Sequence, residues 1–257
     1  MLDQKQRDIL AVAILPPTAA SLSFCSTLAV GQAAGRVLRV SCATPLLGSM
    51  LGGLAVAAAS VAAAQVSFTV RGMWEHNSKK QKQKFITTES VWFHAMFGLI
   101  AFKVLGGRCR NMMPSNVIRP GAWARASIPA RGSKYANETE ANLIKDLFKQ
   151  YGCHHCGTRH GQSIADHMPP NAILKQSQAR KFQRLLHNLN QLFVKKQPIM
   201  QRLFPQCSSC MKLQSTALRH GKSTFVFHFQ QGIPQPPYWT GFCVGALGAF
   251  LEGQSMV

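Results

Sequence analysis

Long apolar runs dominate the first half of the chain. Residues 9–35 carry no charged side chain, although two adjacent prolines interrupt them, and residues 40–70 are uncharged throughout. The second run is longer than the roughly 20 residues that cross a bilayer, and its Gly48-x-x-x-Gly52 spacing allows close helix packing. The pattern therefore predicts a membrane-crossing helix over 40–70. An Ala/Gly-rich helix buried in a soluble core is the alternative.

Two shorter apolar runs follow. Residues 90–102 predict either a short span, when extended by a few residues, or a helix lying at the membrane interface with Trp92 as its anchor. Residues 233–251 are uncharged and end close to the last residue of the sequence, as a tail anchor would. We therefore expect an α-helical membrane-associated region over 1–106 and an apolar segment, a possible tail anchor, over 231–257.

The middle of the chain changes character. Residues 107–134 are basic and contain several prolines and glycines, which predicts a linker without regular structure. Asn137 then precedes Glu140 by three positions, ahead of apolar residues at helical spacing. This is the capping-box pattern of a helix start, and we prefer it to the glycosylation acceptor that the same residues match. Residues 223–229 alternate like a strand that could extend a sheet.

The sequence has a large excess of basic over acidic residues. The chain has 29 Lys plus Arg against 9 Asp plus Glu, a formal net charge of +20, yet only 15% of its residues are charged. A soluble domain usually has about 25% charged residues. Apolar segments that alternate with basic loops explain both values, as in a membrane protein. The excess positive charge predicts a polyanionic partner, either nucleic acid or anionic lipid.

The eight cysteines are of two kinds. Cys153 and Cys156 form one CxxC pair, Cys207 and Cys210 form another, and four are solitary. Each CxxC turn directs two thiolates to one point, so the two pairs predict the closed four-cysteine site of a structural zinc ion. Two unrelated redox turns, or coincidence, are the alternatives. Pairs confined to one region do not suit a secreted disulfide scaffold, so we expect a reducing compartment.

A further motif lies between the two pairs. Ile164-Ala165-Asp166-His167 is predicted to be a strand, and Pro169 stands two residues after it. With a CxxC before it and a second CxxC opening a helix after it, this region (150–220) resembles the HNH endonuclease superfamily. The resemblance implies a ββα-metal, treble-clef-like fold for a zinc-binding domain over 135–230.

The resemblance also implies roles for individual residues. The histidine that matches His167 acts as general base towards the attacking water, and the carboxylate that matches Asp166 binds a divalent ion. The chain departs from the family directly after the second CxxC, where Met211 replaces the second ligand, a His or Asn. We therefore expect nuclease chemistry to be weakened or lost. Asp166 would then only hold the loop and His167 pack beneath the zinc site.

The segment between the motif and the second CxxC has a pattern of its own. Residues 172–197 combine an apolar helical face with lysines and arginines elsewhere. Such a helix can contact nucleic-acid phosphates, lie on an anionic membrane, or simply present a solvated face.

Two hypotheses of function follow. The first is a membrane-associated zinc protein whose HNH-like domain binds nucleic acid or another polyanion. The second is a structural or adaptor membrane protein whose zinc domain docks a protein partner. The fold class expected in both is an α-helical membrane-associated N-terminal region joined to a small α+β zinc-stabilised domain.

Overall fold

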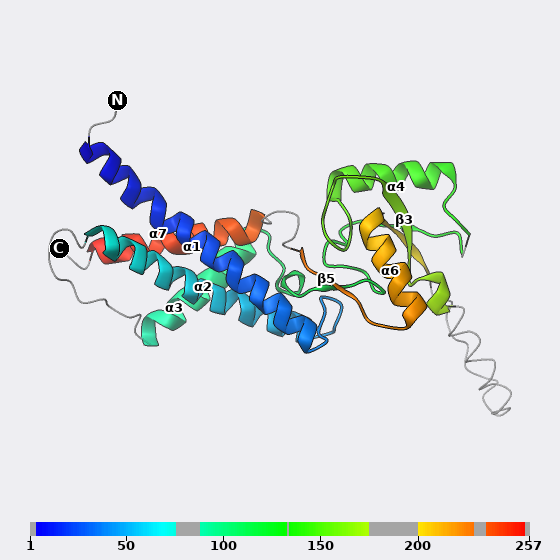
Figure 1. Cartoon of the computed structure of the whole chain (residues 1–257), viewed down its shortest axis with the longest axis horizontal. Helices are drawn as coiled ribbons and strands as arrows, with labels where there is room; N and C mark the ends of the chain where they lie inside the picture. The colour runs from blue at the N-terminus through cyan, green and yellow to red at the C-terminus, as the bar shows by residue number, and fades with distance from the viewer. Residues whose placement is uncertain (1–3, 76–87, 133, 175–199, 229–234, 255–257) are drawn as a thin grey trace. The chain divides into compact units, whose positions relative to one another are not determined.

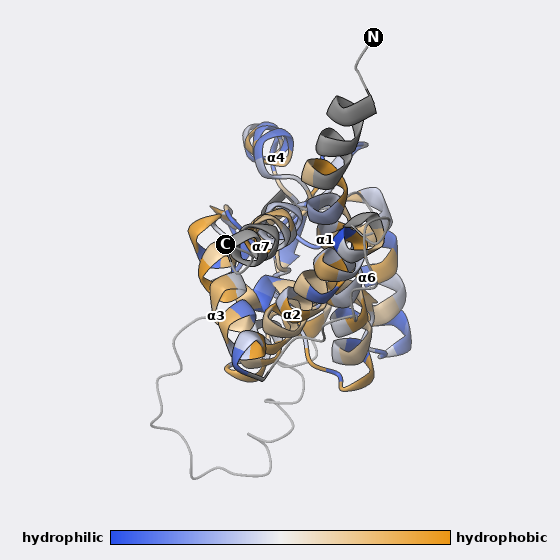
Figure 2. Cartoon of the chain, turned by 90° about the vertical axis from the view of Figure 1, so that its left-hand side faces the viewer, coloured by the Kyte–Doolittle hydropathy of each residue, from blue (hydrophilic) through white to orange (hydrophobic). Residues whose placement is uncertain are grey.

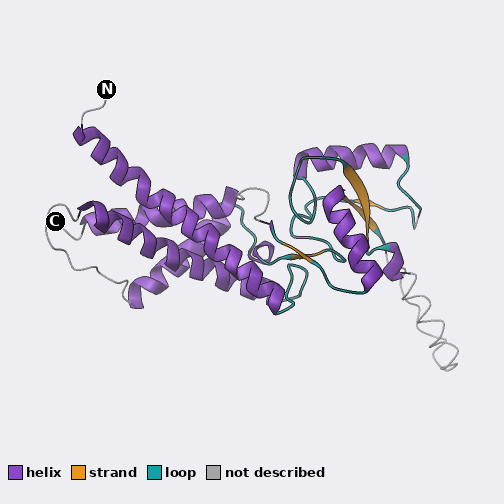
Figure 3. Ribbon diagram, in the orientation of Figure 1, coloured by secondary structure: helices purple, strands orange, loops and turns teal. Residues whose placement is uncertain are grey.

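The computed structural model describes residues 4–75, 88–132, 134–174, 200–228 and 235–254 (Figures 1 and 3). The chain divides into two compact units. The first, the bundle, comprises Met1–Val40, Thr44–Met113 and Gly232–Val257. The second, the cysteine unit, comprises Ser41–Ala43 and Pro114–Gln231.

Four α-helices make up the described part of the bundle. They are α1 (Gln4–Val37), α2 (Leu47–Glu75), α3 (Thr88–Val104) and α7 (Gln235–Gln254), with the short 3₁₀ helix η1 (Cys109–Met112) after α3. Each of α1, α2 and α3 packs against its neighbour in sequence, and α7 packs against all three (Figure 1). Most of residues 90–106 thus lies in α3 within the bundle. The sequence had left open whether this segment is a membrane span or an interfacial helix.

Small residues allow these helices to approach closely. A Cβ added at Gly31 of α1 would lie 3.1 Å from Ala55 of α2, and one added at Gly245 of α7 would lie 2.6 Å from Ala20 of α1. The hydroxyl of Ser67 in α2 donates a hydrogen bond of 3.0 Å to the Gly245 carbonyl. These contacts are of the kind expected where helices pack without a hydrophobic driving force between them.

Two of the described helices are long and apolar enough to cross a membrane, by length and composition: Ala13–Val37 and Leu47–Met73. The predicted span over 40–70 therefore begins later than expected. Residues 40–46 form turns between the helices, because Arg39 and Leu46 adopt left-handed backbone angles with φ of 55° and 56°. A left-handed arginine costs roughly 1 kcal/mol relative to glycine, which lacks the Cβ clash.

Large apolar side chains lie on the outside of the bundle. Trp92, Met96 and Ile100 form a stripe along α3 and are 69%, 54% and 58% exposed. The ribbons of α2 and α3 are coloured mostly at the hydrophobic end of the scale (Figure 2). Much of the interior, by contrast, is alanine and serine, for example Ala59, Ser60, Ala63 and Ala64. Larger side chains, among them Phe24, Leu28 and Phe102, are fully buried as well.

The described residues of the cysteine unit include two small antiparallel sheets and two long helices. Strand β4 (Arg202–Cys207) is central in a sheet of order β2-β4-β3, with β2 at Ile128–Pro129 and β3 at Ser163–Met168. Strand β1 (Ser115–Asn116) pairs separately with β5 (Phe225–Val226). Helix α4 (Glu138–Tyr151) leads to the first CxxC pair, and α6 (Ser208–His220) follows β4 directly.

The observed units differ from the expected segments. Residues 114–134, expected to be a linker, carry β1 and β2 and belong to the cysteine unit, and so do Ser41–Ala43. Two-residue strands leave no sequence period to recognise, since one needs about four alternating positions. The alternating run at 223–229 does contain β5, but it pairs with β1 instead of extending the main sheet. The predicted basic helix over 172–197 lies mostly outside the described residues.

The predicted start of α4 is confirmed. Asn137 Oδ1 accepts a hydrogen bond of 2.8 Å from the Glu140 amide, and Glu140 Oε2 accepts one of 3.0 Å from the Asn137 amide. This reciprocal capping box satisfies two amides that a helix start would otherwise leave unpaired. Helix α4 then buries Ile144 and Phe148 and ends at Gly152, directly before Cys153.

Candidate metal centre

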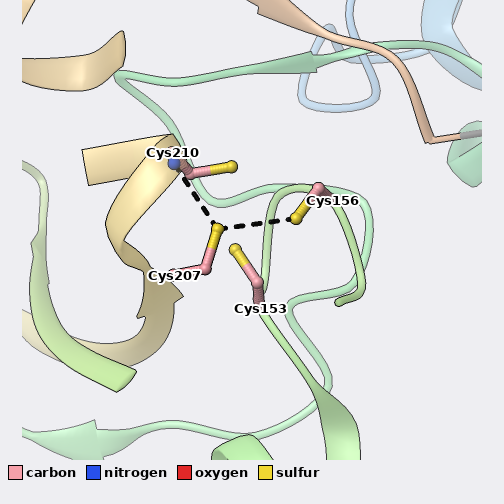
Figure 4. Close-up of side chains that lie close together, drawn as sticks. All are labelled: Cys153, Cys156, Cys207 and Cys210. Carbon is pink, nitrogen blue, oxygen red and sulfur yellow. Dashed lines mark hydrogen bonds between the residues drawn. The ribbon is translucent and has the colours of Figure 1, made fainter. Parts of the chain in front are cut away.

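The first CxxC pair, Cys153 and Cys156, lies in a tight turn that glycine makes possible. We call the turn around each CxxC pair a knuckle. Gly152 and Gly157 have φ of 78° and 79°, and a Cβ on Gly152 would overlap the Gly157 carbonyl. The amide of Cys153 donates to the Thr158 carbonyl at 2.7 Å, and the amide of Gly157 donates to the Cys153 carbonyl at 2.8 Å. These bonds close the loop, so that Cys153 and Cys156 are both held on its inner side (Figure 4).

The second knuckle joins a strand to a helix. Cys207 ends β4 and is the N-cap of α6, where its Sγ accepts a hydrogen bond of 3.4 Å from the Cys210 amide. Cys210 lies in the first turn of α6. A thiolate is favoured at this place, because unpaired amides and the helix dipole present partial positive charge there.

The two knuckles bring four sulphur atoms together, from residues more than fifty positions apart. All four Sγ atoms lie within 4.8 Å of one another, and Cys156 Sγ is 3.7 Å from Cys207 Sγ. The four side chains point towards a common centre (Figure 4) and are at most 6% exposed. Such a cluster can hold a metal ion, and its all-thiolate donors suit zinc, which takes four sulphurs tetrahedrally.

Without a metal the four thiols do not ionise independently. Hydrogen bonds from Cys153, Cys156 and Cys210 lower the pKa of the Cys207 thiol, and those bonds outweigh the effect of its burial. Hydrogen bonds with Cys153, Cys156 and Cys207 raise the pKa of Cys210, with burial adding to the effect. A thiolate at one position therefore makes a second one less favourable, and a bound cation would be needed to stabilise several together.

A second buried cluster lies beside the first. The ligand atoms of His154, His155 and Asp166 also lie within 4.8 Å of one another. Asp166 Oδ2 lies 3.1 Å from His154 Nε2 and 3.0 Å from the side-chain amide nitrogen of Gln214. Burial raises the pKa of Asp166 to about 7, against the opposing effects of Gln214 and His167.

The protonation of His154 follows from its neighbours. Burial lowers its pKa to about 3, so the ring is neutral. Its Nδ1 accepts a hydrogen bond of 3.2 Å from the Gly121 amide, so the one ring proton is on Nε2 and is donated to Asp166. A metal ion bound at Nε2 would displace that proton. The proton could not move to Nδ1 without breaking the hydrogen bond that Nδ1 accepts from the Gly121 amide.

This cluster therefore offers few free lone pairs to the divalent ion that was expected at Asp166. Asp166 Oδ2 already accepts two hydrogen bonds, and His154 presents a donor, not a lone pair. His155 is fully buried. Burial is the main cause that lowers its pKa, and the charges of the nearby His154 and His228 lower it further. The hydrogen bonds support a structural use of Asp166, which joins β3 to the first knuckle and to α6.

The other residues named by the resemblance lie apart from this network. His167 follows Asp166 in β3, and consecutive strand residues project to opposite faces. Its side chain is 9% exposed, and its Nε2 has no hydrogen-bond partner among the described residues. Met211 contacts its own helix, where its Sδ accepts from the Ser215 hydroxyl at 3.5 Å. The residue of α6 that reaches Asp166 is Gln214, one helical turn after Cys210.

Two residues of the site were not singled out by the sequence. Gln214 donates to both Asp166 and the Val117 carbonyl, and its position four residues after Cys210 on a helix could have indicated it. Ser115 lies 2.8 Å from His228 Nε2, accepts from the Ala122 amide and donates to the His155 carbonyl. No local pattern marks Ser115, because its partners are distant in sequence.

The chain matches no protein-family model, no curated protein sequence and no solved structure.

Proposed function

We propose that this is a membrane-anchored protein whose cysteine unit, stabilised by zinc, binds nucleic acid through phosphate contacts without cleaving it. The observation that carries the proposal is the charge of the exposed surface. In the described part of the cysteine unit every lysine and arginine is exposed. They are Arg119, Arg125, Arg131, Lys134, Lys145, Lys149, Arg159, Arg202, Lys212, Arg219 and Lys222.

Few carboxylates offset this charge. Asp166 is buried, and Glu140 is engaged in the capping box and contacts Arg131 at 3.3 Å. Asp146 lies 3.8 Å from Lys149, leaving Glu138 as the fourth acidic side chain of the described unit. Contacts with nucleic-acid phosphates are made mostly by exposed Lys and Arg, so the imbalance supports a polyanionic partner.

Helix α6 carries two of these exposed cations, and its N-cap and first turn hold the second cysteine pair of the cluster. Its buried face holds Cys210, Gln214 and Ala217, three positions spaced as one side of a helix. Lys212 and Arg219 lie on the opposite, exposed side. The zinc site would hold the start of α6 in place, so these two cations would be presented on a rigid element.

The arrangement around Asp166 supports binding without hydrolysis. A hydrolytic metal needs hard ligands and open positions for water and phosphate. Here Asp166 is buried and accepts bonds from His154 and Gln214. The four-cysteine site would be closed to water, since its sulphurs fill a tetrahedral zinc ion.

Two features support membrane anchoring. The helices Ala13–Val37 and Leu47–Met73 have the length and composition to cross a bilayer. Large apolar side chains such as Trp92, Met96 and Ile100 are exposed on α3. Lipid would cover this surface, which water would not tolerate. Alkaline carbonate extraction tests the point: we expect the protein to stay in the pellet, and its release would contradict the anchor.

Salt dependence tests nucleic-acid binding. The full chain in neutral detergent should bind a fluorescent RNA or DNA with an affinity that falls as salt rises. Lys212→Gln with Arg219→Gln should reduce the slope of log K against log salt by about 1.8 for a duplex, or 1.4 for a single strand. Lys145→Gln with Lys149→Gln on α4 removes the same charge elsewhere and is the matched control.

The outcomes distinguish the two hypotheses. No binding at low salt would contradict the proposal and favour the adaptor role, in which the cysteine unit docks a protein. Equal effects of the two double variants would show that charge, not the α6 surface, decides. Cleavage of a plasmid with magnesium or manganese that is lost in His167→Ala, with zinc retained, would contradict the absence of hydrolysis.

A further inference from the structure

One end of the bundle gathers exposed cations from separate parts of the chain. Arg39 follows α1, Lys103 lies in the last turn of α3, and Arg108 and Arg110 flank the start of η1; all four are exposed. We call these four residues the basic rim. They lie at the same end of the bundle because α2 begins just after the turn that ends α1, and η1 packs against the first turns of α2, where a Cβ on Gly52 would overlap the Cys109 carbonyl. Helix α3 runs antiparallel to α2, with His94 beside Phe68 and Gly98 beside Ser60, so its last turn also lies at this end.

Among the described residues, none of the ion pairs involves the basic rim. The sequence contains no Asp or Glu between residues 9 and 74, nor between 90 and 137. The described carboxylate of Glu89 belongs to the first turn of α3, at the other end of that helix from Lys103. The rim therefore has a positive field that an external anion would satisfy.

Exposed apolar side chains lie next to two of these cations in the sequence. Val37 and Leu38 next to Arg39 are 82% and 62% exposed, Val104 next to Lys103 is 80% exposed, and Leu46 is 80% exposed. Nucleic acid offers phosphates but no apolar layer for such side chains. The boundary of a bilayer offers both, because acyl chains lie directly beneath the headgroups.

The backbone at Arg39 adds an independent observation. The amide of Val40 donates to the Gly35 carbonyl at 2.8 Å, which closes α1 with Arg39 in the left-handed position that glycine normally occupies. An arginine there is less favourable for the helix end than glycine would be. Such a local cost points to a use for the side chain beyond the fold of the turn.

We propose that the basic rim binds the headgroup phosphates of anionic phospholipids while its apolar neighbours enter the edge of the acyl layer. The proposal rests on the membrane anchoring proposed above and adds a lipid class and its residues. It is separate from the phosphate contacts of α6, since the rim belongs to the bundle.

Lipid titration tests the rim. The full chain in neutral detergent is titrated with phosphatidylglycerol, and with phosphatidylcholine as the neutral counterpart, while the melting temperature is followed. Phosphatidylglycerol should raise the melting temperature at lower concentration than phosphatidylcholine. Arg108→Gln with Arg110→Gln should weaken the apparent phosphatidylglycerol affinity about fivefold for each cation removed. Lys145→Gln with Lys149→Gln should leave the affinity unchanged.

A single substitution separates lipid binding from folding. Arg39→Gly should raise the melting temperature without lipid, because glycine suits the left-handed position. The same variant should respond less to phosphatidylglycerol, which a merely structural residue would not cause. Wild-type phosphatidylglycerol affinity in both Arg39→Gly and the Arg108/Arg110 variant would overturn the proposal.

Two further outcomes have distinct meanings. Equal stabilisation by inorganic phosphate would overturn the lipid assignment, since the apolar neighbours would then contribute nothing. Absence of a preference for phosphatidylglycerol, in protein that still resists carbonate extraction, would refute the rim and leave the anchor intact. Release by carbonate would instead refute the anchor itself.

Discussion

The bundle and the cysteine unit differ in the side chains that predominate in their interiors. Alanines, glycines and serines make up much of the bundle interior, and many of its large apolar side chains are exposed. The core cluster of the cysteine unit instead consists largely of its four cysteines, with Val117, Phe148, Ala217 and Val226 around them. Among the described residues, larger apolar side chains such as Phe24 and Leu28 in the bundle, and Ile144 and Leu203 in the cysteine unit, complete the two interiors.

Under the proposed function, each unit would be stabilised by a partner of a different kind. Lipid around the bundle would remove its outer apolar surface from water. A metal in the cysteine unit would take the place of apolar burial, because binding free energy to a folded site is folding free energy. Changes that affect one partner should therefore leave the other unit nearly intact.

Loss of the metal should give the largest effect. Cys153→Ser or a strong chelator should abolish zinc binding and unfold the cysteine unit, because structural zinc contributes about 10–16 kcal/mol in small domains. The bundle should keep its helicity. Metal analysis should find about one zinc per chain in the wild type, and proteolysis should cut only the cysteine unit of the variant.

Cys243→Ser is the matched control, since Cys243 is a solitary cysteine of α7. It should retain both zinc and resistance to proteolysis. A folded, metal-free cysteine unit with two disulfides would contradict the prediction.

Asp166→Asn should have the next largest effect, within the cysteine unit alone. Burial raises the pKa of Asp166 from 3.8 to about 7, so its protonated form stabilises the fold fully below pH 3.8, and this contribution is lost as the pH rises to about 7. Asparagine avoids the buried charge and can still accept from His154 and Gln214. The variant should therefore be more stable above pH 7, by up to about 4 kcal/mol.

Denaturant unfolding of the zinc-loaded protein between about pH 6 and 8.5 measures this difference. The advantage of the variant should shrink by up to about 1.4 kcal/mol per pH unit below pH 7 and level off above it. A pH-independent difference would refute the raised pKa. Stabilisation of the wild type alone by magnesium or manganese would show instead that Asp166 binds a divalent ion.

Adjacent glycines of α2 provide a smaller test in the bundle. Gly52→Ala should cost about 1–3 kcal/mol, because the new Cβ would overlap the Cys109 carbonyl. Gly53 has open space around it, so Gly53→Ala should stabilise the helix by roughly 0.5–1 kcal/mol. Melting temperatures in one detergent compare the two. Equal effects of both substitutions would show that η1 does not pack tightly against α2.

The capping box should give the smallest effect. Asn137→Ala should destabilise the zinc-loaded cysteine unit by about 1 kcal/mol, since the Glu140 amide loses its acceptor. Thr139→Ala, at an exposed position of the same helical turn, is the control. In zinc-free protein neither substitution should change the unfolding of this unit, which is then already unfolded. A cap effect that persists without zinc would show that the unit folds without its metal.

The parts that could be predicted are those written in short stretches. Asn137 and Glu140 predict the start of α4. The spacing of the two CxxC pairs predicts two knuckles, and their sulphur atoms do lie close together. The boundaries were less predictable. The uncharged run from 40 to 70 begins with a turn that the sequence did not predict. The hydrophobicity of a residue does not indicate the left-handed backbone angles found at Arg39 and Leu46.

Local patterns in the chain predicted the long apolar helices, the two CxxC turns and the capped start of α4. Which residues distant in sequence contact one another is seen only in the folded protein. It places Gln214 and His154 on Asp166, β1 against β5, and Ser115 against His228. These contacts join residues 12 to 113 positions apart, and a buried hydrogen bond depends on the three-dimensional position of both partners, which no local pattern encodes.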